Sequence, residues 1–176
     1  MTLNVLEPQS ASSEAAGLLE KAQQKYGFIP NILGVMAHSP ALLEAYMSLS
    51  QIFEKTSFSA AEKQTVLLAV STENSCGYCK AAHTTIAKMQ NVDEAVLDAI
   101  ASGDKLPDAK LDTLFNFTRT LVEKRGSPSD SDLKAFFDAG YSEAQVQDVL
   151  VGIGMKTLSN YNNHMFDPPL DAQFGG

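Results

Sequence analysis

The sequence has only two cysteines, and both lie in the short segment Cys76-Gly77-Tyr78-Cys79. Two cysteines are too few for a secreted disulfide scaffold, whereas such close spacing in a cytosolic chain is typical of redox chemistry or metal binding. The chain also lacks any apolar run near the ~20 residues that a membrane span needs. Its first residues lack the basic start and apolar stretch of a signal peptide. We therefore expect a cytoplasmic protein with no membrane partner.

Basic residues are in the minority, since 13 Lys and Arg stand against 21 Asp and Glu, for a net charge of −8. Nucleic acids and anionic membranes are polyanions, so an acidic chain disfavours both as partners. Hydrophobic residues make up 44% of the 176 residues. That share is typical of a globular protein and argues against disorder.

No segment alternates apolar and polar residues with a period of two, and no long repeat or linker divides the chain. We therefore predict an all-α protein with a single domain over residues 1–176. Residues 1–12 are expected to be a flexible arm and residues 166–176 an extended tail. About eight helices are expected, from nine candidate stretches: residues 13–26, 30–36, 39–53, 59–70, 76–88, 92–102, 109–124, 129–139 and 142–161.

Two of these helices carry specific local signals. Ser59 and Glu62 form a capping box ahead of a helix that is apolar nearly all round, which predicts a buried, central helix. Ser142 and Gln145 form a second box before the last helix. Gly152 and Gly154 lie inside this last helix, where glycine costs up to ~1 kcal/mol, and they suggest close approach of a neighbouring helix.

The helix expected over residues 76–88 brings Cys76, Cys79 and His83 to one face, because residues three and four apart are neighbours on a helix. The partial positive charge at a helix N-terminus stabilises a thiolate. His83 is positioned to act as a base toward Cys79. The helix dipole favours Cys76 as the nucleophile and the imidazole favours Cys79. We favour Cys79, because a base one turn away is the more specific device.

This arrangement suits a thiol peroxidase with antioxidant activity. One thiolate attacks the O–O bond of a peroxide and becomes a sulfenic acid. The second thiol condenses with it to a disulfide, which a small dithiol then reduces. The expected substrate is hydrogen peroxide or a small organic hydroperoxide, and no cofactor is expected.

Other interpretations of the cysteine pair remain open. The thiols can be small buried hydrophobes, or a redox sensor in which the disulfide changes assembly without turnover. They can also supply half of a zinc site with His83, the fourth ligand coming from His164, His38, Glu73 or water. The sequence contains no second Cys-x-x-Cys and no His-x-x-x-His, which counts against zinc.

The segment from Cys76 through Cys79 to His83 resembles the redox motif of the AhpD-like alkylhydroperoxidases, in the carboxymuconolactone decarboxylase superfamily. The stretches 26–31 and 160–164 are similar to its peroxidase-related branch. The resemblance implies an all-helical fold, a homo-oligomer (trimer or hexamer) and a peroxide-reducing dithiol in which Cys79 attacks and Cys76 resolves. It also implies a dihydrolipoyl protein as reductant. A decarboxylase or other lactone-acting enzyme is the further alternative within this superfamily, although such members generally lack the cysteine pair.

One position departs from the family pattern. Where the redox-active members have a glutamate twelve residues before the first cysteine, this chain has Gln64. A glutamine does not accept a proton, but it can orient His83 or a water molecule. Glu73 is a second candidate for polar support of the thiols. A slow peroxidase, a disulfide reductase and a redox sensor are all compatible with this change.

Overall fold

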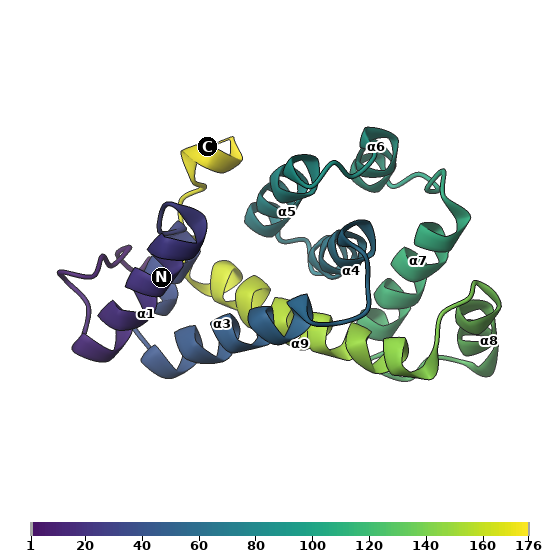
Figure 1. Ribbon diagram of the computed structural model, residues 1–176, viewed down its shortest axis with the longest axis horizontal. Coiled ribbons are helices and arrows are strands. Elements are labelled where there is room, and N and C mark those ends of the chain that lie inside the picture. The colour runs from purple at the N-terminus through teal and green to yellow at the C-terminus, as the bar shows by residue number, and fades with distance from the viewer. Residues whose placement is uncertain (1, 176) are drawn as a thin grey trace.

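The computed structural model describes residues 2–175, and in that range the chain forms α-helices, one short 3-10 helix and no strand (Figure 1). The all-α prediction is therefore confirmed. The elements are α1 Ser13–Tyr26, α2 Asn31–Met36, α3 Pro40–Glu54, α4 Ala60–Glu73, α5 Gly77–Met89, α6 Glu94–Ser102, α7 Ala109–Glu123, α8 Asp130–Asp138, α9 Glu143–Phe166 and η1 Ala172–Phe174.

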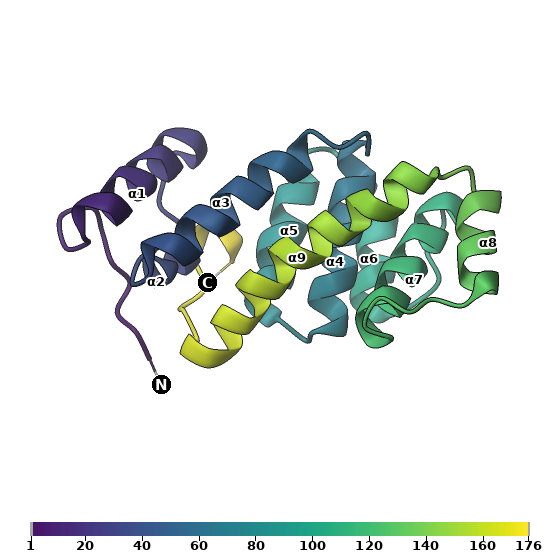
Figure 2. The ribbon, with the colours of Figure 1, turned by 90° about the horizontal axis from the view of Figure 1, so that it is seen from below.

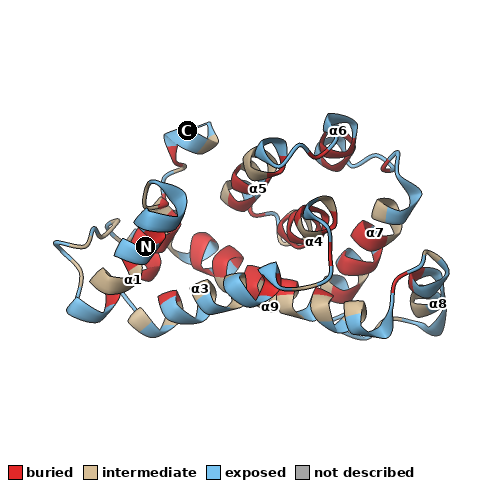
Figure 3. Cartoon of the chain, in the orientation of Figure 1, coloured by how far each residue is buried: buried red, intermediate tan, exposed pale blue. Residues whose placement is uncertain are grey.

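Helix α4 is the centre of the fold. It packs against α5, α7 and α9, which surround it when the molecule is viewed as in Figure 1. Nearly every residue from Glu62 to Ser71 is buried, and Figure 3 shows α4 as the helix buried on most of its surface. The prediction of a central, buried helix is confirmed. The helix extends to Glu73, beyond the expected end, because the turn that leads into α5 begins only at Asn74.

The predicted capping boxes set the starts of α4 and α9. Ser59 accepts from the amide of Glu62 at 3.2 Å, and the Glu62 carboxylate accepts from the amide of Ser59 at 2.8 Å. Ser142 and Gln145 repeat the arrangement at the start of α9, at 3.3 and 2.9 Å. Each box satisfies amides that the first helical turn leaves without partners.

The last helix is longer than predicted. Instead of ending near residue 161, α9 continues to Phe166, and it runs beside α3 across the molecule (Figure 2). The apolar positions that predicted this helix end at Leu158. Beyond them, Asn160, Asn162 and Asn163 are buried, with side-chain partners inside the protein. Asparagine side chains can compete with a helix for its backbone groups, but here they are held by other side chains, and the helix continues.

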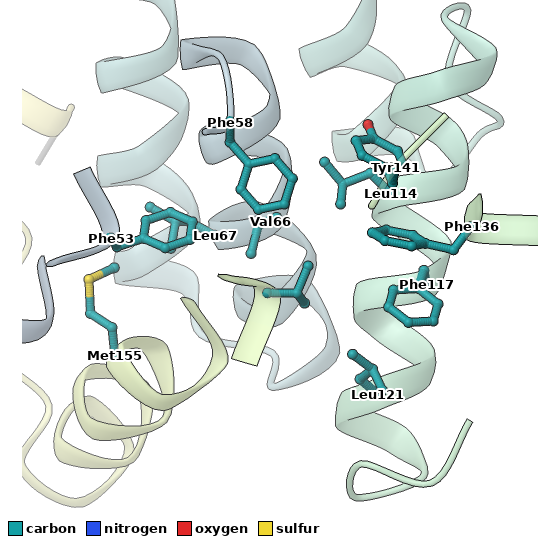
Figure 4. Packing of buried hydrophobic residues seen from close by; sticks show 11 residues of the cluster. Phe53, Phe58, Val66, Leu67, Leu114, Phe117, Leu121, Phe136, Tyr141 and Met155 are labelled. Carbon is teal, nitrogen blue, oxygen red and sulfur yellow. The ribbon is translucent and has the colours of Figure 1, made fainter. Parts of the chain in front are cut away.

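A large apolar cluster joins α3, α4, α7, α8 and α9 (Figure 4). The ring of Phe136 stacks on Phe117 with centroids 4.2 Å apart and on Tyr141 at 4.6 Å. The two glycines of α9 differ in role. A Cβ on Gly152 would lie 2.8 Å from Cγ1 of Val66, whereas a Cβ on Gly154 would meet nothing within 4 Å. The predicted close approach is confirmed at Gly152 and is wrong at Gly154.

Both ends of the described chain lie against α2. In the segment expected as an arm, the Leu6 amide donates to the Gly34 carbonyl at 3.1 Å and His38 contacts the Asn4 carbonyl at 2.9 Å. The C-terminal segment is not extended throughout, because it contains η1 and packs against α5. Asp171 accepts from the amide of Asn31 at 3.0 Å, which holds this segment at the start of α2.

Within residues 2–175, no helix combines the length and apolarity that crossing a membrane requires.

Candidate active site

The two cysteines lie at the start of α5, directly after a tight turn from α4. Cys76 is the N-cap of α5, one position before the first turn in which the sequence predicted it. Cys79 lies within that turn. Ser75 adopts a left-handed conformation with φ of 55°, and the Cys76 amide donates back to the Ser71 carbonyl at 2.9 Å. The turn is also held by Asn74, which donates to Asn160 at 3.0 Å. The short connection thus fixes both thiols against α4 and α9.

Both thiols are free and buried, with 2% of each residue exposed. Cys79, but not Cys76, lines a cavity of about 660 Å³, together with His83, Gln64 and Lys156. The cavity walls also include six aromatic residues, namely Tyr26, Phe28, Tyr46, Phe53, Tyr78 and Phe174. A molecule in this cavity would therefore meet Cys79 first, in apolar surroundings.

His83 is buried, and a chain of amides fixes its ring. Nδ1 of His83 lies 3.0 Å from Oε1 of Gln64, and Nε2 of Gln64 donates to Oε1 of Gln90 at 3.1 Å. Because the second bond directs the amide NH₂ of Gln64 toward Gln90, its oxygen faces the imidazole, which therefore donates from Nδ1. Nε2 of His83 then keeps its lone pair. Burial lowers the pKa of His83 well below its usual value, and the charge of Lys156 adds to this effect. The imidazole is neutral at pH 7.

Three polar residues of α9, namely Lys156, Ser159 and Asn163, form a polar strip on the side of the helix that carries the contacts to the thiols. Nδ2 of Asn163 lies 3.5 Å from Sγ of Cys79 and 3.7 Å from Sγ of Cys76, and Oγ of Ser159 lies 3.9 Å from Sγ of Cys79. Lys156, only 1% exposed, belongs to the same strip and lines the cavity. Sequence reasoning missed the strip. The sequence feature that could have predicted the strip is the spacing of Lys156, Ser159 and Asn163, at i, i+3 and i+7 in a largely apolar helix.

The surroundings separate the pKa values of the two thiols in opposite directions. The pKa of Cys79 is lowered, first by the hydrogen bond from Cys76 and then by the charge and hydrogen bonding of Lys156 and by Ser159, all of which outweigh burial. The pKa of Cys76 is raised, because its thiol is the donor to Cys79 and because it is buried. These opposite directions favour Cys79 as the thiol of the pair that ionises first, with Cys76 as the proton-bearing neighbour.

The structure brings together four of the five residues singled out in the sequence, Cys76, Cys79, His83 and Gln64. It does not bring Glu73 to them. Oε2 of Glu73 instead pairs with Nε of Arg119 on α7, at 2.9 Å. The reason is the helical register, because Glu73 is the last residue of α4 and its side chain extends toward α7 rather than α5. His164 is exposed in the last turn of α9, where a base complements the helix dipole.

Across the described range 2–175, no group of three or more His, Cys, Asp and Glu side chains is arranged to hold a metal ion.

Residues 40–108 match the model of the Carboxymuconolactone decarboxylase family. A comparison with curated proteins finds no significant match. Among solved structures, the chain is similar to an uncharacterized peroxidase-related protein from Ralstonia eutropha JMP134, described as an alkylhydroperoxidase AhpD core. The TM-score is 0.86 at 20% identity, over 98% of this chain and 93% of that chain.

Two further structures have the same fold. A peroxidase-related protein from Silicibacter sp. TM1040 gives a TM-score of 0.80 at 19% identity, over 94% of this chain and 88% of that chain. The debrominase Bmp8, as a cysteine-to-alanine variant in complex with 2,3,4-tribromopyrrole, gives 0.80 at 18% identity, over 99% and 94%. At such identities the likeness establishes the fold.

Proposed function

We propose that this chain, whose residues 40–108 match the model of the carboxymuconolactone decarboxylase family and whose fold is that of the AhpD core, is a thiol-dependent peroxidase. Its substrates are hydrogen peroxide or small organic hydroperoxides. The observation that carries the proposal is the asymmetry of the dithiol. Cys79 lines the cavity with a lowered pKa, while Cys76 lies behind it as a hydrogen-bond donor with a raised pKa.

The chemistry divides between the thiols as follows. The Cys79 thiolate attacks the terminal oxygen of ROOH, the O–O bond breaks, and Cys79 becomes a sulfenic acid. The departing RO⁻ takes a proton from water and leaves as ROH. Cys76 then attacks the sulfur of Cys79, and the hydroxyl group leaves as water with the proton of Cys76. Neutral His83, with a free lone pair on Nε2, is the base that relays this proton through water. An external dithiol, such as a dihydrolipoyl protein, reduces the disulfide.

Peroxide consumption with dihydrolipoamide as electron donor tests the proposal. We expect Cys79→Ser to abolish turnover. We expect Cys76→Ser to stop after one equivalent of peroxide, with a sulfenic acid at Cys79 that dimedone traps and mass spectrometry locates. Wild-type turnover in both variants would disprove the proposal.

The proposal includes a cytoplasmic homo-oligomer, and the sensor alternative makes a different prediction about assembly. Light scattering after size-exclusion chromatography on the reduced and the oxidised protein separates the two. A peroxidase is expected to keep one oligomeric state and to turn over peroxide. A change of subunit number on oxidation with negligible turnover favours the sensor.

A second candidate function follows from the size and walls of the cavity. About 660 Å³ with aromatic walls admits an organic ring, and the debrominase Bmp8 has the same fold. In reductive debromination, an aryl bromide and two thiols give the aryl hydrogen compound, a disulfide and HBr, so the dithiol supplies both electrons. Bromide release from a bromopyrrole under single-turnover conditions, compared with peroxide reduction, ranks the two activities.

A further inference from the structure

Lys156 is a buried lysine to which none of the peroxidase steps described above assigns a role. It lies on α9 with 1% of its surface exposed. Among the ion pairs found within residues 2–175, none includes Lys156. Transferring an ammonium group from water into a protein interior costs several kcal/mol unless an anion or strong acceptors compensate. A buried ammonium at this position therefore needs an anion or strong acceptors close to it.

The carboxylates around the cavity are already committed. Glu54, the only acidic residue in the described cavity lining, pairs with Lys63 at 3.5 Å. Asp171 accepts from the hydroxyl of Tyr78 and from the amide of Asn31. The remaining acid that Lys156 can serve is the thiol of Cys79, which lines the same cavity.

The register of α9 supports this pairing. Ser159 lies one turn after Lys156, and Asn163 lies about two turns after it. Both contact Sγ of Cys79, at 3.9 and 3.5 Å. Lys156 lies on the same face of α9 as these two residues and lines the cavity that Cys79 also lines. The Ser159 hydroxyl donates its single proton to the carbonyl of Lys156 at 3.2 Å, so its oxygen is the acceptor toward Cys79. Asn163 divides its amide between both sulfurs. Lys156 is the one donor with a full charge.

We propose that Lys156 is a catalytic group that holds Cys79 as a thiolate by placing its buried ammonium beside the sulfur. This deepens the proposed function by identifying the charge that activates the nucleophile. Because residue 64 is a glutamine, His83 lacks the carboxylate neighbour that would make it a stronger base. With the charge of Lys156 beside the sulfur, Cys79 can ionise without a stronger base. Burial lowers the pKa of His83, and the same ammonium adds to this effect, which keeps the imidazole neutral.

Other titratable groups also face Cys79 and enter its pH dependence. Cys76 and His83 lie on the same helix or its cap, Tyr46 faces it from α3, and Lys156 faces it from α9. Burial raises the pKa of Tyr46, so its hydroxyl stays neutral over the working range. With His83 and Tyr46 neutral, Lys156 is the positive charge that faces the thiolate.

A redox consequence follows. Closing the disulfide removes the negative charge of Cys79 and leaves the buried ammonium without its partner. Lys156 therefore stabilises the reduced form over the oxidised form, which makes the disulfide a stronger oxidant. Replacing Lys156 with a neutral side chain should shift the thiol–disulfide equilibrium toward the disulfide.

The test uses pH-dependent alkylation of Cys79 by iodoacetamide in the Cys76→Ser background, where it is the only cysteine. Lys156→Met keeps the length and volume of the side chain and removes the charge. We expect it to raise the pH midpoint of alkylation by at least about one unit, which corresponds to roughly ten-fold slower alkylation below the midpoint. Lys156→Arg should keep the midpoint low. Lys80→Met is the matched control, since Lys80 follows Cys79 in the chain but is exposed to solvent, and it should leave the midpoint unchanged.

An unchanged midpoint in Lys156→Met, or an equal shift in Lys80→Met, would overturn the proposal. If Lys156→Met does not fold, Lys156→Gln provides the same comparison. Glutathione redox titration of the otherwise unmodified protein with and without Lys156→Met is a second readout, and an unchanged equilibrium would also count against the proposal. Neither measurement depends on peroxidase turnover, so a failure of the proposed function is distinguishable from a failure of this inference.

Discussion

At the scale of single residues, the site places an amide where a carboxylate would make His83 more basic. Gln64 still fixes the ring, because its oxygen accepts from Nδ1 while its NH₂ group is engaged by Gln90. An amide at this position orients the imidazole and selects its tautomer, but it does not stabilise an imidazolium as a carboxylate does. Ionisation of Cys79 must therefore depend on other groups.

We predict that Gln64→Leu slows peroxide reduction by about five-fold or more, since a lost hydrogen bond to a buried group is worth at least ~1 kcal/mol and each ~1.4 kcal/mol is ten-fold in rate. The leucine leaves Nδ1 of His83 without an acceptor, so the ring is free to change tautomer. Gln64→Glu keeps an acceptor and serves as the matched control, with the rate retained or raised. Stopped-flow kinetics measure the rates and ¹⁵N NMR of His83 reports the tautomer. An unaltered rate in Gln64→Leu together with a changed tautomer would refute the proposed role of the ring.

At the scale of elements, the position of α9 against α3 and α4 depends on one glycine. A Cβ at Gly152 would lie 2.8 Å from Val66 and 3.0 Å from Phe53, both of which are packed in the core. Because α9 also carries Lys156, Ser159 and Asn163, its distance from α4 determines how these side chains meet the thiols on α5. The close approach at Gly152 is thus a structural condition for the site.

We predict that Gly152→Ala destabilises the protein by about 1–3 kcal/mol, the usual cost of overpacking a core. Gly154→Ala is the control on the same helix, because its Cβ would meet nothing within 4 Å. It should be neutral or stabilising by up to ~1 kcal/mol, since alanine favours helix. Urea denaturation of the two variants measures the difference in unfolding free energy. Equal effects at the two positions would show that the helix contact does not control the stability of α9.

At the scale of the whole molecule, the cavity is assembled from segments far apart in the sequence. Tyr26 comes from α1, Tyr46 from α3, Gln64 from α4 and Phe174 from η1 near the end of the chain. Asp171 holds this last segment in place, because it bonds both to the hydroxyl of Tyr78, which lies between the cysteines, and to the start of α2. The ring of Phe174 then packs edge-on against Tyr78 and Phe28.

We predict that Asp171→Ala releases the C-terminal segment from the cavity. Amide hydrogen exchange should accelerate over residues 170–175 and at the start of α2, because their shared acceptor is lost. In peroxidase assays, KM for a bulky apolar hydroperoxide should rise more than KM for hydrogen peroxide, since only the larger molecule needs the Phe174 wall. Asp138→Ala is the control, because Asp138 forms an exposed ion pair with Lys134 on α8, and it should change neither measurement. Unchanged hydrogen exchange in Asp171→Ala would contradict the proposed role of Asp171 in holding the C-terminal segment against α2 and Tyr78.

Local sequence signals determined the helices and the first half of the site. The capping boxes, the apolar periodicity and the Cys-x-x-Cys spacing act within one or two helical turns. The sequence alone therefore predicts the starts of α4 and α9 and the shared helix face of Cys76, Cys79 and His83. Tertiary structure decided what lies opposite that face. Lys156 and Asn163 are about eighty residues away along the chain, and a buried lysine is indistinguishable in sequence from a solvated one. Glu73 was a candidate by proximity in sequence, yet the register of α4 directs it to Arg119. Which charge reaches a buried sulfur depends on how helices pack, because electrostatic interactions follow distance in space and not separation along the chain.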